Sequence, residues 1–265
     1  MLQQFLLCVV ICVVALATFA CSRADTSEES AVDPGAATVG FEHDEGMSPE
    51  DQMIIEEAIG SSRQFYAGEL GRDLKFNITV KVTTIDGGNL GGFSAGRTAW
   101  ILAGGEWWPE GSGRFATISK SRLAAHELFH NFQSDLIYTD DAIPSSSPWW
   151  LVEGSAEYAS AVFIAREYGV SWSYIKADYF FSLEPGLPRL DVTARPVEHF
   201  GALYTKAFLA MDQLMTGRPM STVGDYFEAT GRMEWDEAFL QVFGIDPAAF
   251  VNEFEAQYQA LLTQP

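Results

Sequence analysis

Cysteine is nearly absent from this chain of 265 residues, and its three cysteines all lie within the first 21 positions. They are Cys8, Cys12 and Cys21. The remainder of the chain has no cysteine pair, which excludes a disulfide as a constraint on its fold and a thiolate as a metal ligand. A metal site in that part must therefore use histidine or carboxylate side chains.

Basic residues are also few, because 16 Lys and Arg stand against 36 Asp and Glu and give a formal net charge of −20. Binding of nucleic acid requires clustered Lys and Arg, so we exclude nucleic acid as a partner and disfavour docking on anionic lipid. We interpret the acidity as a source of solubility in a salty or crowded exterior. The alternative is that it attracts basic peptides.

Residues 1–21 have the composition of a signal peptide or lipoprotein-type leader. Phe5–Ala20 is almost wholly apolar, and about 16 such residues suit a signal-peptide core better than a spanning helix. No basic residue precedes this core, so an uncleaved anchor is the alternative. Cys21 follows Thr18-Phe19-Ala20, which resembles a bacterial lipobox. We expect an extracytoplasmic protein, either secreted or attached to the membrane through its leader or a lipidated Cys21.

The rest of the chain divides into an acidic tether, residues 22–46, and one domain, residues 47–265. Strand patterns come first and helix patterns follow, which predicts an α+β fold. The expected strands are Phe76–Thr84 and Thr98–Ala103, with a glycine-rich turn at Asp86–Gly92 between them. The expected helices are Met47–Gly71, Ser119–Leu136, Trp149–Tyr168, Ser171–Leu183, Gly201–Thr216, Ser221–Ala229, Trp235–Phe243 and Pro247–Leu262.

The helix predicted over Ser119–Leu136 contains an H-E-x-x-H motif formed by His126, Glu127 and His130. Residues four apart share one helix face, so both imidazoles can reach one tetrahedral ion. Glu127 lies about 100° around the helix from His126, where it can act on a water without being a ligand. The motif lies in an apolar helix, and its polar side chains would be costly to bury without a partner. A metal ion would supply that partner.

The next predicted helix carries two more carboxylates, Glu153 and Glu157, again four residues apart and on one face. One carboxylate would complete a site of two histidines and one acid, with a fourth position open. The other would accept a hydrogen bond from a ligand imidazole. The spacing alone does not assign the two roles.

Two stretches resemble the gluzincin metallopeptidases, most closely the bacterial exported peptidase MA-like group. They are Ala125–Gln133 (AHELFHNFQ) and Trp150–Tyr158 (WLVEGSAEY), and Trp235–Leu261 is similar to the end of that group. The resemblance implies a zincin-like fold, in which a small N-terminal mixed sheet precedes a mainly helical subdomain with the active-site cleft between them. It implies one Zn²⁺ per chain and Glu153 as its third ligand. Glu157 is then the acid that accepts a hydrogen bond from a ligand histidine.

The resemblance also implies hydrolysis of peptide bonds, with a peptide or protein as substrate and Glu127 as general base. Such enzymes stabilise the oxyanion with a Tyr or His from a later helix, for which Tyr204 and His199 are the candidates. They pair the substrate backbone with an edge strand, for which we expect Thr98–Ala103. The alternatives are a zinc-binding exported module without turnover and a zinc hydrolase of non-peptide substrates.

Overall fold

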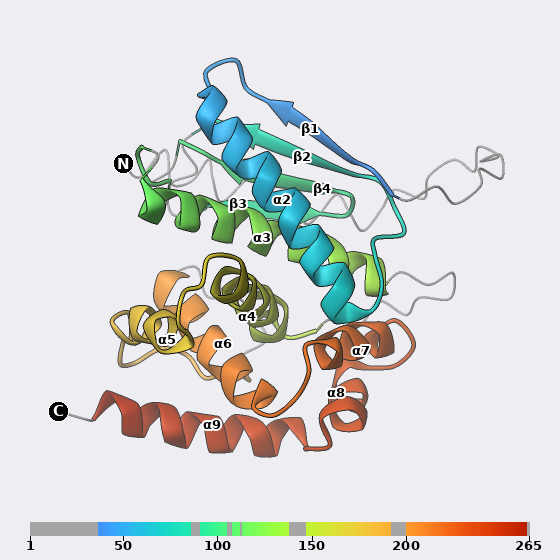
Figure 1. Ribbon diagram of the computed structural model, residues 1–265. Helices are drawn as coiled ribbons and strands as arrows, with labels where there is room; N and C mark the ends of the chain where they lie inside the picture. Colours follow the sequence, from blue (N-terminus) through green and yellow to red (C-terminus); the bar gives the residue numbers. More distant parts are fainter. Residues whose placement is uncertain are drawn as a thin grey trace, which may run out of the picture. The chain divides into compact units, whose positions relative to one another are not determined.

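A four-stranded mixed sheet forms the N-terminal part of the structure (Figure 1). The computed structural model describes residues 37–85, 91–104, 108–111, 113–137, 147–191 and 200–263. The sheet has the order β1-β2-β4-β3, in which β1, β2 and β4 are parallel and β3 is antiparallel to β4. Its strands are β1 (Val39–His43), β2 (Ile78–Thr83), β3 (Gly92–Ala95) and β4 (Thr98–Leu102).

The prediction of a disordered tether over residues 22–46 is wrong from residue 37 onward, because Val39–His43 forms strand β1. The acidic composition of residues 22–46 hid a short alternating segment, in which Val39 and Phe41 pack against the core. The parallel pairing of β1 with β2, from Val39 opposite Ile78 to His43 opposite Val82, gives the segment its order. The domain therefore includes residues from Ala37 onward. Residues 1–36, including Cys21, lie outside the described part of the chain.

The prediction that Thr98–Ala103 is an edge strand is wrong. The predicted strand at Thr98–Ala103 is present as β4, but it lies inside the sheet between β2 and β3. The edge strand beside β4 is β3, whose sequence Gly-Phe-Ser-Ala has no apolar alternation that would have revealed it, and β1 forms the other edge. Its order comes from antiparallel pairing with β4, from Gly92 opposite Ile101 to Ala95 opposite Thr98.

Outside the sheet the described residues are mainly helical, which confirms the α+β prediction. The helices are α2 (Pro49–Leu70), α3 (Arg114–Ile137), α4 (Trp149–Glu167), α5 (Trp172–Phe180), α6 (Phe200–Met215), α7 (Ser221–Thr230), α8 (Trp235–Phe243) and α9 (Pro247–Leu262). Most bounds lie within three residues of those expected. Helix α3 begins five residues before Ser119, the expected start. Among the described helices, none is both long and apolar enough to cross a membrane.

Helix α3 lies at the centre of this arrangement. In Figure 1, α2 and α3 cover one face of the sheet, and α4 and α6 follow on the side of α3 away from it. Val80 and Val82 on β2 are buried, and so are Leu128 and Phe129 on α3. Burial of such side chains is the main source of the stability of the fold. A side chain on α3 can therefore face either the sheet or α4.

Candidate metal centre

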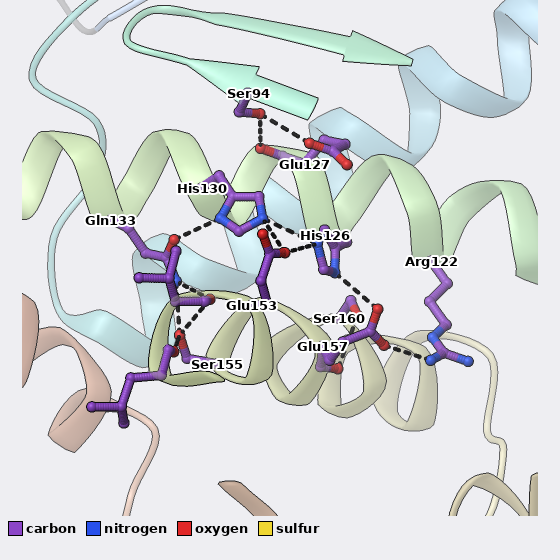
Figure 2. A network of polar contacts seen from close by, with 12 residues as sticks. Ser94, Arg122, His126, Glu127, His130, Gln133, Glu153, Ser155, Glu157 and Ser160 are labelled. Carbon is purple, nitrogen blue, oxygen red and sulfur yellow. Dashed lines mark hydrogen bonds and ion pairs between the residues drawn. The ribbon is translucent and has the colours of Figure 1, made fainter. Parts of the chain in front are cut away.

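The two histidines of α3 face the same way because they stand one helical turn apart. Both imidazoles point from α3 toward α4 (Figure 2), and their Nε2 atoms are 3.0 Å apart. The neighbouring residues Ala125, Leu128 and Phe129 are fully buried, and His126 itself is only 5% exposed. The helix thus holds two nitrogen donors together in a largely buried place.

Glu153 of α4 brings a carboxylate to the same point. Its Oε2 lies 3.5 Å from Nε2 of His126 and 3.3 Å from Nε2 of His130. A tetrahedral zinc ion with bonds of about 2.0–2.2 Å would hold its donors about 3.3–3.6 Å apart. The two distances to Glu153 match this spacing, and the two nitrogens would separate by a few tenths of an ångström. The residues present therefore fit a zinc ion with an open fourth position.

Glu157 lies behind His126, on the opposite side of the imidazole ring from Glu153 (Figure 2). Its Oε1 is 3.2 Å from Nδ1 of His126, and its Oε2 accepts hydrogen bonds from Arg122 at 2.6 Å and from the hydroxyl of Tyr179. Of the two carboxylates whose roles the spacing left open, Glu153 is the one among the donor atoms. Glu157 instead favours protonation of Nδ1, which leaves Nε2 as the donor.

The electrostatics of the cluster favour a positive charge between the carboxylates. Burial alone would lower the pKa of His126, but its contacts with Glu153 and Glu157 raise it to about 10. Burial opposes ionisation of Glu157, yet Arg122 and His126 hold the pKa of that carboxyl well below its usual range. The same surroundings that retain a proton on His126 would attract a metal cation to Nε2.

Glu127 faces the sheet and is not part of the donor cluster. The hydroxyl of Ser94 on β3 lies 2.8 Å from the backbone carbonyl oxygen of Glu127 and 3.1 Å from its Oε2. Gly92 leaves room for the carboxylate, because a Cβ there would stand 2.7 Å from Oε1. Burial raises the pKa of Glu127 above the usual value for a glutamate. A buried carboxyl with a raised pKa has the properties of a general base.

The two oxyanion candidates have different outcomes. Tyr204 on α6 lies beside the cluster, with its ring centroid 5.9 Å from that of His126. His199 lies outside the described residues. The structure also adds residues that sequence reasoning missed, namely Ser94, Arg122, Gln133 and Tyr179. The sequence held a positional signal for Gln133, three residues after His130 on the same helix, and for Arg122, four residues before His126. It held no such signal for Ser94 and Tyr179.

Comparison with known proteins places the fold but not the family. No family model matches the chain, and no curated protein matches it. Among solved structures it is similar to an M1 zinc metallopeptidase from Deinococcus radiodurans, with a TM-score of 0.50 and 20% identity over 88% of this chain and 51% of that chain. The described chain has the fold of M1 zinc metallopeptidases.

Other M1 structures agree. A two-domain M1 zinc metallopeptidase mutant bound to L-arginine gives a TM-score of 0.52 with 18% identity, covering 82% of this chain and 47% of that one. A two-domain M1 zinc metallopeptidase mutant bound to L-tryptophan gives a TM-score of 0.52 with 18% identity, covering 84% of this chain and 49% of that one. The chain thus spans about half the length of these enzymes. The similarity therefore concerns the fold of the matched half and not the activity of these longer enzymes.

The raised pKa of His126 generates a prediction for metal binding. A zinc ligand must be deprotonated at the donor atom, so zinc should displace the proton from His126. We expect zinc binding to the metal-free protein at about pH 8 to release about one proton, since His126 is still protonated there. Calorimetry in buffers of different ionisation enthalpy measures this number. A binding enthalpy independent of the buffer would contradict the electrostatic description of the site.

Proposed function

We propose that this protein hydrolyses peptide bonds with one zinc ion held by His126, His130 and Glu153. The observation that carries the proposal is the triangle of donor atoms, with sides of 3.0, 3.3 and 3.5 Å, beside a buried glutamate that is not part of it. Two histidines and one acid with an open position are typical of catalytic rather than structural zinc sites. Glu127 gives this site a base.

A bound zinc ion supplies electrophilic polarisation of a carbonyl and increases the acidity of water. Glu127 takes a proton from the attacking water and passes it to the leaving amine. Burial moves the pKa of Glu127 upward, toward neutral pH, which suits a group that must accept and then release a proton. Ser94 holds the carboxylate through Oε2 in the position from which it acts.

The proposed substrate is a peptide in an extended conformation. Strand β3 is one of the two edge strands of the described sheet, and it is the one tied to Glu127 through Ser94. An extended peptide can add to such an edge by backbone hydrogen bonds, which would bring its scissile bond toward the donor cluster. One structure of similar fold, with a TM-score of 0.50 and 19% identity over 82% of this chain and 46% of that chain, is an M1 zinc metallopeptidase mutant bound to a Tyr-Ser-Ala substrate.

Tyr204 is the proposed oxyanion stabiliser. Its ring lies next to His126, and α6 packs against α4 so closely that a Cβ on Gly154 would stand 2.6 Å from the carbonyl oxygen of Ala207. This close packing brings Tyr204 to the side of the donor cluster. A phenolic hydroxyl there can donate to the oxygen that becomes negative during attack on the carbonyl.

We also propose, from the leader alone, that the protein acts outside the cytoplasm.

Paired substitutions test the proposed function. Wild-type protein should contain about one zinc per chain, and Glu153→Ala should lose most of it. Glu127→Gln should keep the zinc and lower peptide hydrolysis about 100- to 10,000-fold, because only the proton acceptor is removed. Metal analysis and cleavage of a broad peptide library measure the two properties. Glu57→Gln, an exposed change on α2, is the control.

Two results would refute the proposal. Full retention of zinc by Glu153→Ala would show that the ligand set is wrong. A wild-type protein that holds zinc but cleaves no member of the library would favour the alternative of a zinc-binding module without turnover.

The role of Tyr204 has a separate test. Tyr204→Phe removes only a hydroxyl, so we expect kcat to fall about 100- to 1,000-fold while KM changes little. Steady-state kinetics on a library substrate give both constants. Tyr174→Phe, on an exposed tyrosine of α5, controls for the substitution itself. An unchanged kcat in Tyr204→Phe would assign the oxyanion to another donor.

A further inference from the structure

Gln133 is a buried amide that joins the two helices of the metal centre. It stands on α3 three residues after His130 and is only 3% exposed. Its Oε1 lies 2.7 Å from Nδ1 of His130, and its Nε2 lies 2.8 Å from the carbonyl oxygen of Val152 and 2.7 Å from Oγ of Ser155 (Figure 2). Every polar atom of the side chain thus has a partner.

The partners determine which way the amide points. The carbonyl oxygen of Val152 can only accept, so the NH₂ group must face α4. The Ser155 hydroxyl donates to the carbonyl oxygen of Leu151 at 2.5 Å, which leaves its oxygen free to accept from Gln133. Oε1 of Gln133 must then face His130 as an acceptor. Nδ1 of His130 is consequently the protonated nitrogen, and Nε2 carries the lone pair.

The same side chain also fixes the helical turn that carries the carboxylate ligand. Val152 and Ser155 flank Glu153 on α4, and both accept a hydrogen bond from Nε2 of Gln133. The orientation of His130 on α3 and the position of Glu153 on α4 therefore depend on one amide. The other histidine is held differently, because His126 faces a charged carboxylate, Glu157, that Arg122 neutralises.

We propose that Gln133 is the positioning residue of the metal centre, which fixes the ring of His130 and couples it to the turn that bears Glu153. Its importance for zinc rests on the proposed function. A neutral amide performs this task without adding a fourth carboxylate to a buried cluster that already holds Glu127, Glu153 and Glu157. Loss of such an outer partner typically weakens metal binding about 10- to 100-fold.

Two substitutions at Gln133 separate positioning from packing. Gln133→Met keeps the length and apolar bulk of the side chain but removes both hydrogen-bonding groups. Gln133→Glu keeps an acceptor for Nδ1 of His130 and loses the donors to α4. We expect zinc affinity, measured by competition with a chelator, to fall about 10- to 100-fold in Gln133→Met and to be partly restored in Gln133→Glu. Gln257→Met, on α9, is the matched control and should bind zinc as the wild type does.

A second readout in the metal-free protein does not require zinc binding. In nuclear magnetic resonance spectra, the Nδ1 proton of His130 should be protected from solvent exchange in the wild type and in Gln133→Glu, and lose protection in Gln133→Met.

Wild-type zinc affinity in a folded Gln133→Met would overturn the proposal, as would a protected Nδ1 proton in that variant. If Gln133→Met does not fold, an unprotected proton in Gln133→Glu overturns it. Absence of zinc binding by the wild type would instead refute the proposed function, and the proton readout would still decide the role of Gln133.

Discussion

The structure around α3 depends on one electrostatic constraint, the burial of two imidazoles and two carboxylates where α3 meets α4, with a third carboxylate, Glu127, on the side of α3 that faces the sheet. Glu127, Glu153 and Glu157 would repel one another in such a place unless positive charge were present among them. Arg122 supplies part of that charge at Glu157, and His126 supplies more by keeping a proton, with a pKa raised to about 10. A zinc ion at the point where His126, His130 and Glu153 converge would satisfy the remainder. The described residues thus gather groups that could hold a cation at a place where an ordinary core would be apolar.

The fold serves this constraint by giving α3 two different neighbours. On one side β3 approaches so closely that only glycine fits at position 92, and Glu127 is held there through Ser94. On the other side α4 brings Glu153 and Glu157, and the tight contact at Gly154 lets α6 carry Tyr204 to the same place. Glu127 and the two histidines therefore lie on one helix but face different partners. This separation keeps Glu127 from acting as a ligand although it is adjacent to His126 in sequence.

The sequence predicts those parts of the site that depend on spacing within one helix. The periodicity of an α-helix places His126 beside His130 and Glu153 one turn from Glu157 whatever the tertiary structure is. Which of the two glutamates joins the histidines depends on how α4 lies against α3, and that is a long-range property. Two partners of Gln133, Val152 and Ser155, lie on another helix, so its link between the two helices was not predictable from spacing within α3. Strands β1 and β3 were missed because the acidic surroundings of Val39 and Phe41, and the small residues of Gly92–Ala95, give weak strand patterns that only pairing with β2 and β4 makes stable.

The central claim is that His126, His130 and Glu153 converge on one zinc ion. Anomalous diffraction from crystals of the protein, collected on both sides of the zinc absorption edge, tests it most directly. The account predicts a single strong peak within about 2.0–2.2 Å of Nε2 of His126, Nε2 of His130 and a carboxylate oxygen of Glu153. A structure without such a peak in the presence of zinc, or with zinc held by other side chains, would contradict it.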